Sequence, residues 1–294
     1  MNQIVREGRR LKPDLMVYGE GWDMPTALDS AQKACQRNNA QMPQIAHFND
    51  VFRDVIKGRT SEYEVQARGY MTGNLYQCHE VPSCLCAHTL DGPYTQIYQQ
   101  PHQSINYVEC HDNATSWDKM KDCCKDEVRE VRVRRQKLMI ATVLVAQGIP
   151  FLQSGQEFCR TKYGLHNTYN KPDNINALDW HRCLRNLDVV EFTRDCIQLR
   201  RQIGAFRLRS REQIAAHVSF AMLEGGMVLY QLNDVSQFCP YQTVKVIFNP
   251  SGSVQYVELD GDYLQIFNEA GLVTMPLWIC HLAVNPVSMI VMAR

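Results

Sequence analysis

Polar side chains able to do chemistry follow four short apolar runs of this chain. The runs cover residues 15–18, 45–48, 105–108 and 151–153. The polar residues that end or follow them include Glu20, Trp22, Asn49, Asp50, His111, Asp112, Asn113 and Gln153. Short apolar runs are typical of buried parallel strands, and a parallel barrel builds its active site at the carboxyl ends of its strands. The sequence therefore predicts an α/β fold with its functional site at these four strand ends.

Helical patterns separate the runs, and an alternating pattern replaces them late in the chain. Apolar residues recur with helical spacing over 128–146 and 189–203. From about Phe206, short alternating stretches separated by turn residues are typical of an all-β sandwich. We therefore predict two domains, a (β/α) domain over 1–204 and a β-sandwich domain over 205–294.

The charge balance argues against several classes of partner. Among 294 residues, 31 Lys and Arg balance 31 Asp and Glu, which gives no electrostatic case for nucleic acid or an anionic membrane. The longest apolar stretches are too short to span a bilayer, and the first ten residues lack the apolar segment of a signal peptide. We predict a cytoplasmic protein with neither a nucleic-acid nor a membrane partner.

The twelve cysteines are scattered and include the adjacent pair Cys123 and Cys124. This spacing favours reduced thiols that pack as small apolar residues. A zinc loop is the alternative for one cluster, although its C-x5-C-x-C-x-H spacing is not a usual zinc-binding pattern. The residues of that cluster are Cys78, His79, Cys84, Cys86 and His88. We expect no metal and no cofactor, and the sequence does not support a calcium site either.

Four segments together resemble the type I pullulanases, which are α-1,6-debranching enzymes of the α-amylase family. The segments are Tyr18–Asp23 (Tyr-Gly-Glu-Gly-Trp-Asp), Ile45–Arg53, Ile105–Asn113 with Trp117–Lys119, and Tyr169–Trp180. The likeness runs from Met1 through Trp180 and, more loosely, through the β tail. It implies the C-terminal half of a TIM (β/α)8 barrel, strands five to eight, followed by a small all-β sandwich. It also implies a branched α-glucan substrate, such as pullulan, glycogen or starch limit dextrins.

The resemblance assigns roles to the strand-end residues. Glu20 matches the family's general acid, and partial burial would keep its carboxyl group protonated near neutrality. Its flanking glycines would leave room for a sugar, and Trp22 offers a stacking face. Asp112 matches the acid that stabilises the oxocarbenium-like transition state, while His111 matches a donor to the same sugar and is followed by Asn113. Retaining glycosidases combine such a general acid with a carboxylate nucleophile on the other side of the sugar.

Three further candidates for substrate binding have two interpretations each. Asn49, together with Asp50 and Arg53, either lines the cleft or caps the helix that begins there. Asn170 and Asp173 either face sugar subsites, as the resemblance implies, or belong to a simple turn centred on Pro172-Asp173-Asn174.

The family's nucleophile motif is not in this sequence. That motif is Gly-aromatic-Arg-x-Asp, and this chain has neither an Arg-x-Asp nor an Asn-His pair. The segment Met1–Ile4 matches the helix after the nucleophile strand, so we expect a truncated protein without strands one to four. Four strands cannot close an eight-stranded barrel.

Three functions are compatible with these observations. The expected function is a retaining, pullulanase-type α-1,6-glucan hydrolase that lacks its nucleophile. One alternative is a non-catalytic half-barrel that binds α-glucan or pairs with another chain. The other alternative is a related debranching or branching enzyme of the same family.

Overall fold

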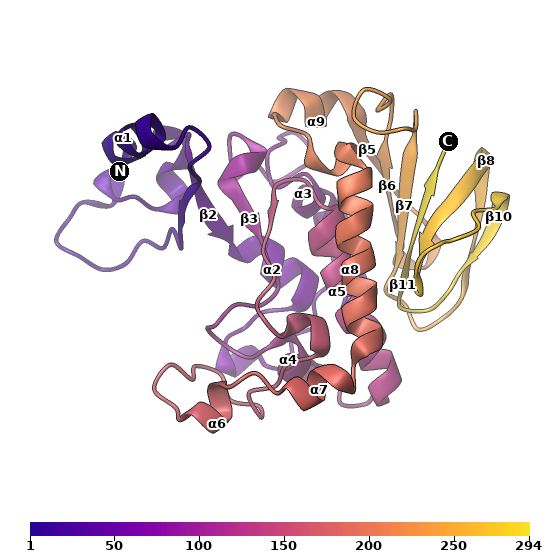
Figure 1. Ribbon diagram of the computed structural model, residues 1–294, viewed down its shortest axis with the longest axis horizontal. Helices are drawn as coiled ribbons and strands as arrows, with labels where there is room; N and C mark the ends of the chain where they lie inside the picture. The colour runs from indigo at the N-terminus through magenta and orange to yellow at the C-terminus, as the bar shows by residue number, and fades with distance from the viewer.

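The computed structural model describes residues 1–294, except for the side chain of Glu62. Its first half contains a parallel sheet of four strands that lie side by side in chain order, at the left of Figure 1. The strands are β1 (Val17–Gly19), β2 (Ile45–Asn49), β3 (Ser104–Asn106) and β4 (Ile149–Pro150). Each neighbouring pair is parallel. The segments that follow the strands therefore leave the sheet at the same end, beyond the carboxyl ends of the strands, as the sequence predicts.

The fourth strand ends before the predicted range 151–153. The pairing of β3 with β4 stops at Asn106 and Pro150, because β3 itself ends at Asn106. The Phe151 N–H still donates to the Asn106 carbonyl at 2.9 Å, so the chain continues beside β3 for one more residue.

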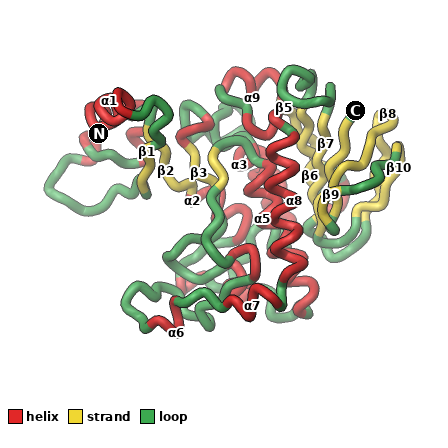
Figure 2. Tube along the Cα trace, viewed as in Figure 1, coloured by secondary structure: helices red, strands yellow, loops and turns green.

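Helices occupy the segments for which the sequence shows helical spacing. These are α5 (Arg129–Val145) and α8 (Leu187–Gln202), while α1 (Asn2–Leu11) and α2 (Asp50–Lys57) are the helices expected at Met1–Ile4 and after Asn49. The shorter helices are α3 (Val81–Leu85), α4 (Ser116–Cys123), α6 (Asp173–Asn176), α7 (Trp180–Leu184) and α9 (Arg211–His217). Helix α5 packs against α8 and against the last strand of the chain, so these two long helices lie between the two sheets (Figures 1 and 2).

A buried arginine joins the long helices to the parallel sheet. Arg200 of α8 donates to the carbonyls of Leu144, Ala146 and Gly148 at 2.7–2.8 Å. The last carbonyls of a helix have no partner within the helix, and Arg200 supplies one. It thereby fixes the chain where α5 ends and β4 begins.

The late strands are joined by hydrogen bonds into one antiparallel sheet. The strand order is β10-β8-β11-β7-β6-β5, and β9 pairs with β8. The strands are β5 (Val218–Met222), β6 (Val228–Leu232), β7 (Val244–Asn249), β8 (Gln255–Asn268), β9 (Gly271–Leu272), β10 (Trp278–Val284) and β11 (Ser288–Ala293).

The long strand β8 connects two groups of strands that pack on each other through a shared apolar cluster. Its first part pairs with β10 and its last part pairs with β11, so one strand of 14 residues carries the hydrogen bonding from one group of strands to the other. Alternate residues of β7 and β11 belong to two separate apolar clusters, one shared with the helices and one shared with β8 and β10. The sheet therefore has a buried apolar layer on each face.

Both edges of the parallel sheet are open within the described residues. There, β1 pairs only with β2 and β4 pairs only with β3, so the sheet does not close into a barrel. All strands of the antiparallel sheet lie within 218–293, and the domain boundary at 204/205 stays a prediction. No helix among the described residues has the length and apolarity needed to cross a membrane.

Candidate active site

A cavity of about 230 Å³ lies where the parallel strands end. Four predicted site residues line it: Glu20, Trp22, His111 and Asp112. The other lining residues are Phe48, Tyr107, Cys110, Phe151 and Gln153. These side chains come from the ends of all four parallel strands or from the residues that follow them, so the sheet gathers segments more than a hundred residues apart in sequence.

Two acids and a histidine meet at this cavity. A carboxylate oxygen of Glu20, a ring nitrogen of His111 and a carboxylate oxygen of Asp112 lie within 4.8 Å of one another. The His111 Nε2 stands 3.5 Å from the Asp112 Oδ2. All three side chains are exposed. Two carboxyl groups at this separation, with a nitrogen donor beside them, can bind sugar hydroxyls and exchange a proton with a glycosidic oxygen.

Glu20 follows β1 and lies between two glycines, Gly19 and Gly21, which have different effects. A Cβ on Gly19 would meet no atom within 4 Å, which agrees with the space predicted for a sugar. Gly21 has φ +80°, and a Cβ there would stand 2.7 Å from His47 Cδ2. Glycine therefore lets the chain turn closely past β2 directly after the acid. The predicted partial burial of Glu20 is wrong for this chain, since its side chain is exposed.

Buried charges hold the loop that carries His111 and Asp112. Glu109 accepts a hydrogen bond from the Ser116 N–H at 2.6 Å, which ties the end of β3 to the start of α4. Burial raises the pKa of Glu109. Lys162, which is 1% exposed, donates to the His111 carbonyl at 3.0 Å and also to the His166 carbonyl. Burial lowers the pKa of Lys162. Glu109 and Lys162 therefore hold the loop through hydrogen bonds, although neither side chain lines the cavity.

Helix α4 completes this support. Thr115 caps the helix by accepting from the Asp118 N–H at 3.1 Å. The buried Asp118 carboxylate accepts from the Lys162 N–H at 2.6 Å and from the Thr161 hydroxyl. The Asn113 N–H, at a residue with φ +59°, donates to Asn167 Oδ1 at 2.9 Å. Asn113 thus contributes to the shape of the loop, although it does not line the cavity.

Aromatic rings form one side of the cavity. The Phe48 ring centroid lies 5.1 Å from that of Tyr107 and 5.0 Å from that of Phe151, in edge-to-face arrangements. Arg53 donates to the Tyr107 hydroxyl at 2.9 Å, and burial raises the pKa of that hydroxyl. These three rings were not among the predicted site residues. Their positions at the ends of the apolar runs could have predicted that they line the cavity.

Besides Asn113, three predicted substrate-binding residues lie outside this cavity. Asn49 is fully buried and caps α2 by accepting from the Phe52 N–H at 3.0 Å, so the capping interpretation holds and its assignment to substrate binding is corrected. Its amide nitrogen contacts His88 Nδ1 and Ser104 Oγ, each at 2.9 Å. Asn170 lies in an exposed turn and Asp173 begins the short helix α6. The structure does not bring either of these two residues to the lining.

The structure does not gather the residues of the zinc-loop alternative into a set of three close ligand atoms. Cys84 Sγ and His88 Nε2 lie 4.0 Å apart, and the other ring nitrogen of His88 is used by Asn49. Among the described residues, the ligand atoms close enough together to hold a metal ion belong to Glu20, His111 and Asp112 rather than to this cluster.

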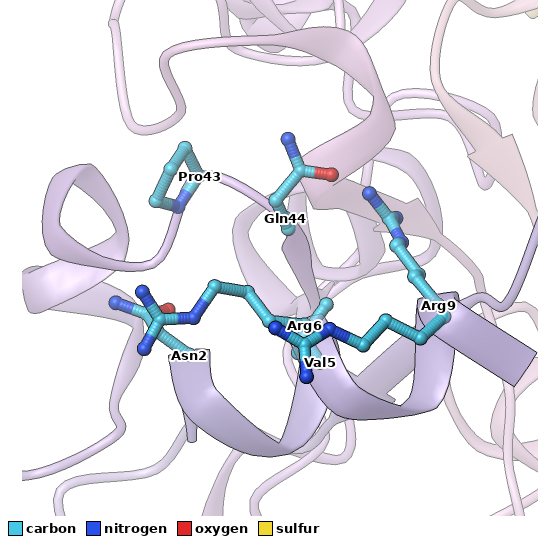
Figure 3. A pocket seen from close by; sticks show the side chains of 7 residues that line it. Asn2, Val5, Arg6, Arg9, Pro43 and Gln44 are labelled. Carbon is cyan, nitrogen blue, oxygen red and sulfur yellow. The ribbon is translucent and has the colours of Figure 1, made fainter. Parts of the chain in front are cut away.

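A larger, basic groove of about 620 Å³ lies beside α1, away from the acids. In Figure 3 the side chains of Arg6 and Arg9 extend along the helix, and Pro43 and Gln44 face them from the segment before β2. It contains none of the predicted site residues.

Comparisons with known proteins give a consistent result. No protein-family model matches the chain. The pullulanase of Bacillus subtilis (strain 168) is 39% identical over 248 residues, which cover 84% of this chain and 34% of that protein. The crystal structure of the type I pullulanase of Bacillus subtilis str. 168 with maltose superposes with a TM-score of 0.95 at 36% identity. It covers 99% of this chain, and the match covers 41% of that structure.

A second solved structure agrees. The pullulanase of Anoxybacillus sp. LM18-11 in complex with maltotetraose has a TM-score of 0.92 at 34% identity, covering 100% of this chain and 41% of that one. This chain therefore spans about a third of the curated relative and about two fifths of the solved structures. It belongs to the type I pullulanases of the α-amylase family and corresponds to a C-terminal portion of such a protein.

Proposed function

We propose that this chain supplies the general acid and the transition-state-stabilising carboxylate of a retaining α-1,6-glucan hydrolase. One observation carries the proposal: Glu20, His111 and Asp112, from two different strand ends, meet within 4.8 Å at a cavity lined by aromatic rings. Aromatic faces beside carboxylates suit a sugar, since the rings pack on its C–H face while the acids bind its hydroxyls. The related pullulanases crystallised with maltose and maltotetraose support an α-glucan as the ligand.

Each residue has a distinct chemical role in this proposal. The Glu20 carboxyl group donates its proton to the glycosidic oxygen as the bond to the leaving sugar breaks. The Asp112 carboxylate and the His111 ring bind hydroxyls of the sugar that develops positive charge, and the negative charge of Asp112 favours that state. Trp22 and the ring of Phe151 bound the space in which the sugar lies.

The retaining reaction also requires a carboxylate nucleophile. The carboxylates lining the cavity within the described residues are Glu20 and Asp112. We therefore propose that the four parallel strands are half of a (β/α)8 barrel, and that a segment with four further strands brings the nucleophile. The open edges of β1 and β4 offer the backbone groups with which such strands would pair.

Complementation tests the proposal. The front half of the Bacillus subtilis pullulanase, ending after its nucleophile, is co-expressed with this chain, and reducing-sugar release from pullulan is measured. We expect no hydrolysis by this chain alone and measurable hydrolysis by the pair. Glu20→Gln and Asp112→Asn should each lower the restored rate by about 10²-fold or more. Glu7→Gln, an exposed change in α1, is the matched control and should leave it unchanged.

Three outcomes would contradict the assignment. Restored activity that survives Glu20→Gln would remove Glu20 as the acid. Hydrolysis by this chain alone would mean that a carboxylate of this chain, and not an added one, is the nucleophile. A folded pair that binds maltotriose without hydrolysing pullulan would instead support a half-barrel that only binds α-glucan.

A further inference from the structure

Two adjacent thiols meet at the end of α4. Cys123 is the last residue of the helix and Cys124 follows it, and their Sγ atoms lie 3.6 Å apart. Of the free cysteines in the described chain, these are the two whose sulfur atoms lie within hydrogen-bonding distance of each other. Cys123 is 6% exposed and Cys124 is fully buried.

The surroundings make the two sulfurs unequal. The hydrogen bond from Cys124, with Lys119 and Arg68 nearby, lowers the pKa of the Cys123 thiol. The same hydrogen bond and burial raise the pKa of Cys124. The Cys124 Sγ also contacts the Thr72 carbonyl at 3.6 Å, and Arg68 donates to the Cys123 carbonyl at 2.7 Å. One sulfur is therefore the better nucleophile, and its neighbour is held beside it.

We propose that Cys123 and Cys124 form a dithiol site that captures trivalent arsenicals of the class R–As(OH)2. The Cys123 thiolate attacks arsenic first, and Cys124 follows. Two As–O bonds break and two As–S bonds form. The two thiol protons leave with the two hydroxide groups as water. Arsenic stays trivalent, so no oxidant or reductant is needed.

The geometry fits a single atom bound to both sulfurs. For a tetrahedral ion with bonds to sulfur of about 2.3 Å, the two sulfurs would stand about 3.8 Å apart, close to the spacing found here. A metal dication nevertheless fits poorly. It would lie near Lys119, Arg68 and Arg135, and the charges of the two arginines are already paired with Glu127. Within the described chain, no His, Cys, Asp or Glu offers a third ligand atom at this place. The arsenical needs only two sulfurs, and its product is neutral.

The thiols lie beneath the turn that follows α4. Lys125 and Asp126 of this turn are exposed. Asp126 is tied down through an ion pair with Arg68 whose shortest N–O distance is 2.5 Å. Helix ends and exposed turns open locally at low cost compared with global unfolding. Opening of this turn gives a small reagent access to Cys123 first.

The test uses the full chain and phenylarsine oxide, which is hydrated in water to a member of this class. The chain is incubated with the reagent and an excess of glutathione, then analysed by intact mass. We expect one phenylarsenic group per chain, which resists glutathione and is removed by dithiothreitol, because two thiols on one chain act at high effective concentration. Peptide mapping of the unaltered chain should place the group on the segment that contains 123–124.

Variants locate the site. Cys123→Ser and Cys124→Ser should each weaken capture by at least about tenfold in glutathione. Cys183→Ser, which changes a half-buried cysteine elsewhere, is the matched control and should not alter it. Capture that survives either variant, or a phenylarsenic group that maps to another cysteine pair in the unaltered chain, would overturn the proposal. The mapping decides the matter even if a serine variant does not fold.

Discussion

Lys162 gives the sharpest test of how the site is held. Its side chain is buried, and its Nζ donates to the carbonyls of His111 and His166. We predict that Lys162→Met both destabilises the chain and loosens the loop that carries His111 and Asp112. Methionine has a similar length but no donor, so it removes the two hydrogen bonds while keeping most of the packing.

The size of the effect follows from the groups left behind. A fully buried carbonyl that loses its donor costs about 1–3 kcal/mol, and because both of these hydrogen bonds are part-buried, their loss would cost less than twice that amount. Removing the ammonium group also removes the cost of burying its charge, which offsets part of this loss. We therefore expect the free energy of unfolding to fall by about 3 kcal/mol, a large share of the ~5–15 kcal/mol typical of a domain.

Urea unfolding and NMR measure the two parts of this prediction. Lys121→Met is the matched control, because Lys121 also contacts Asp118, at 3.3 Å, but its side chain is 45% exposed. Exposed ion pairs contribute about 0–1 kcal/mol, so the control should change little. The ring signals of His111 should shift or broaden in Lys162→Met only. If the two variants differ by less than about 1 kcal/mol and His111 is unaffected, Lys162 does not hold the loop.

Two further predictions concern buried residues near the site. Burial lowers the pKa of Lys57 to about 8 from 10.5, so between these pH values the unfolded chain binds more protons than the folded chain and this group's contribution to stability rises with pH. Lys57→Met should therefore raise the free energy of unfolding by up to about 3 kcal/mol at pH 7. This gain should shrink above pH 8 and nearly vanish at pH 10, as measured by urea unfolding. An equal gain at pH 7 and pH 10 would contradict the prediction. Asn49→Ala should cost about 2–3 kcal/mol, because it removes a helix cap and a buried amide, yet leave maltotriose binding to the folded chain unchanged. If the folded variant no longer bound maltotriose, Asn49 would be a substrate-binding residue.

Local pattern was enough to predict that the two acids lie close together. From the apolar runs, Glu20 and Asp112 were expected at the carboxyl end of a parallel sheet, and both line the cavity found there. Asn49 was ambiguous for a physical reason. A helix cap and a cleft residue have the same sequence signal. Asn49 is held in the buried position by His88, which lies 39 residues away in sequence. Lys162 carried no local signal either, since a lysine in a polar loop is ordinarily solvated.

One strand of the β tail is longer than its sequence pattern predicts. The alternation that indicates a strand covers 253–259. In the structure β8 runs on to Asn268, with Gly261 at φ +153°. Glycine inside a strand often marks a close approach or a bend rather than an end. Which of the two occurs depends on whether neighbouring strands continue the pairing, and β10 and β11 do so here.

The two acids of the cavity differ in what holds them. The loop with His111 and Asp112 follows β3, which is paired on both sides, and buried Glu109 and Lys162 fasten it. Glu20 follows β1, which is paired on one side within the described chain. Added strands would therefore change the surroundings of Glu20 more than those of Asp112. Covering Glu20 would also supply the partial burial that favours a protonated general acid, which the exposed carboxyl group lacks here. Under the proposed assignment, this chain alone holds the stabilising carboxylate in place, whereas the setting of the general acid depends on what pairs with β1.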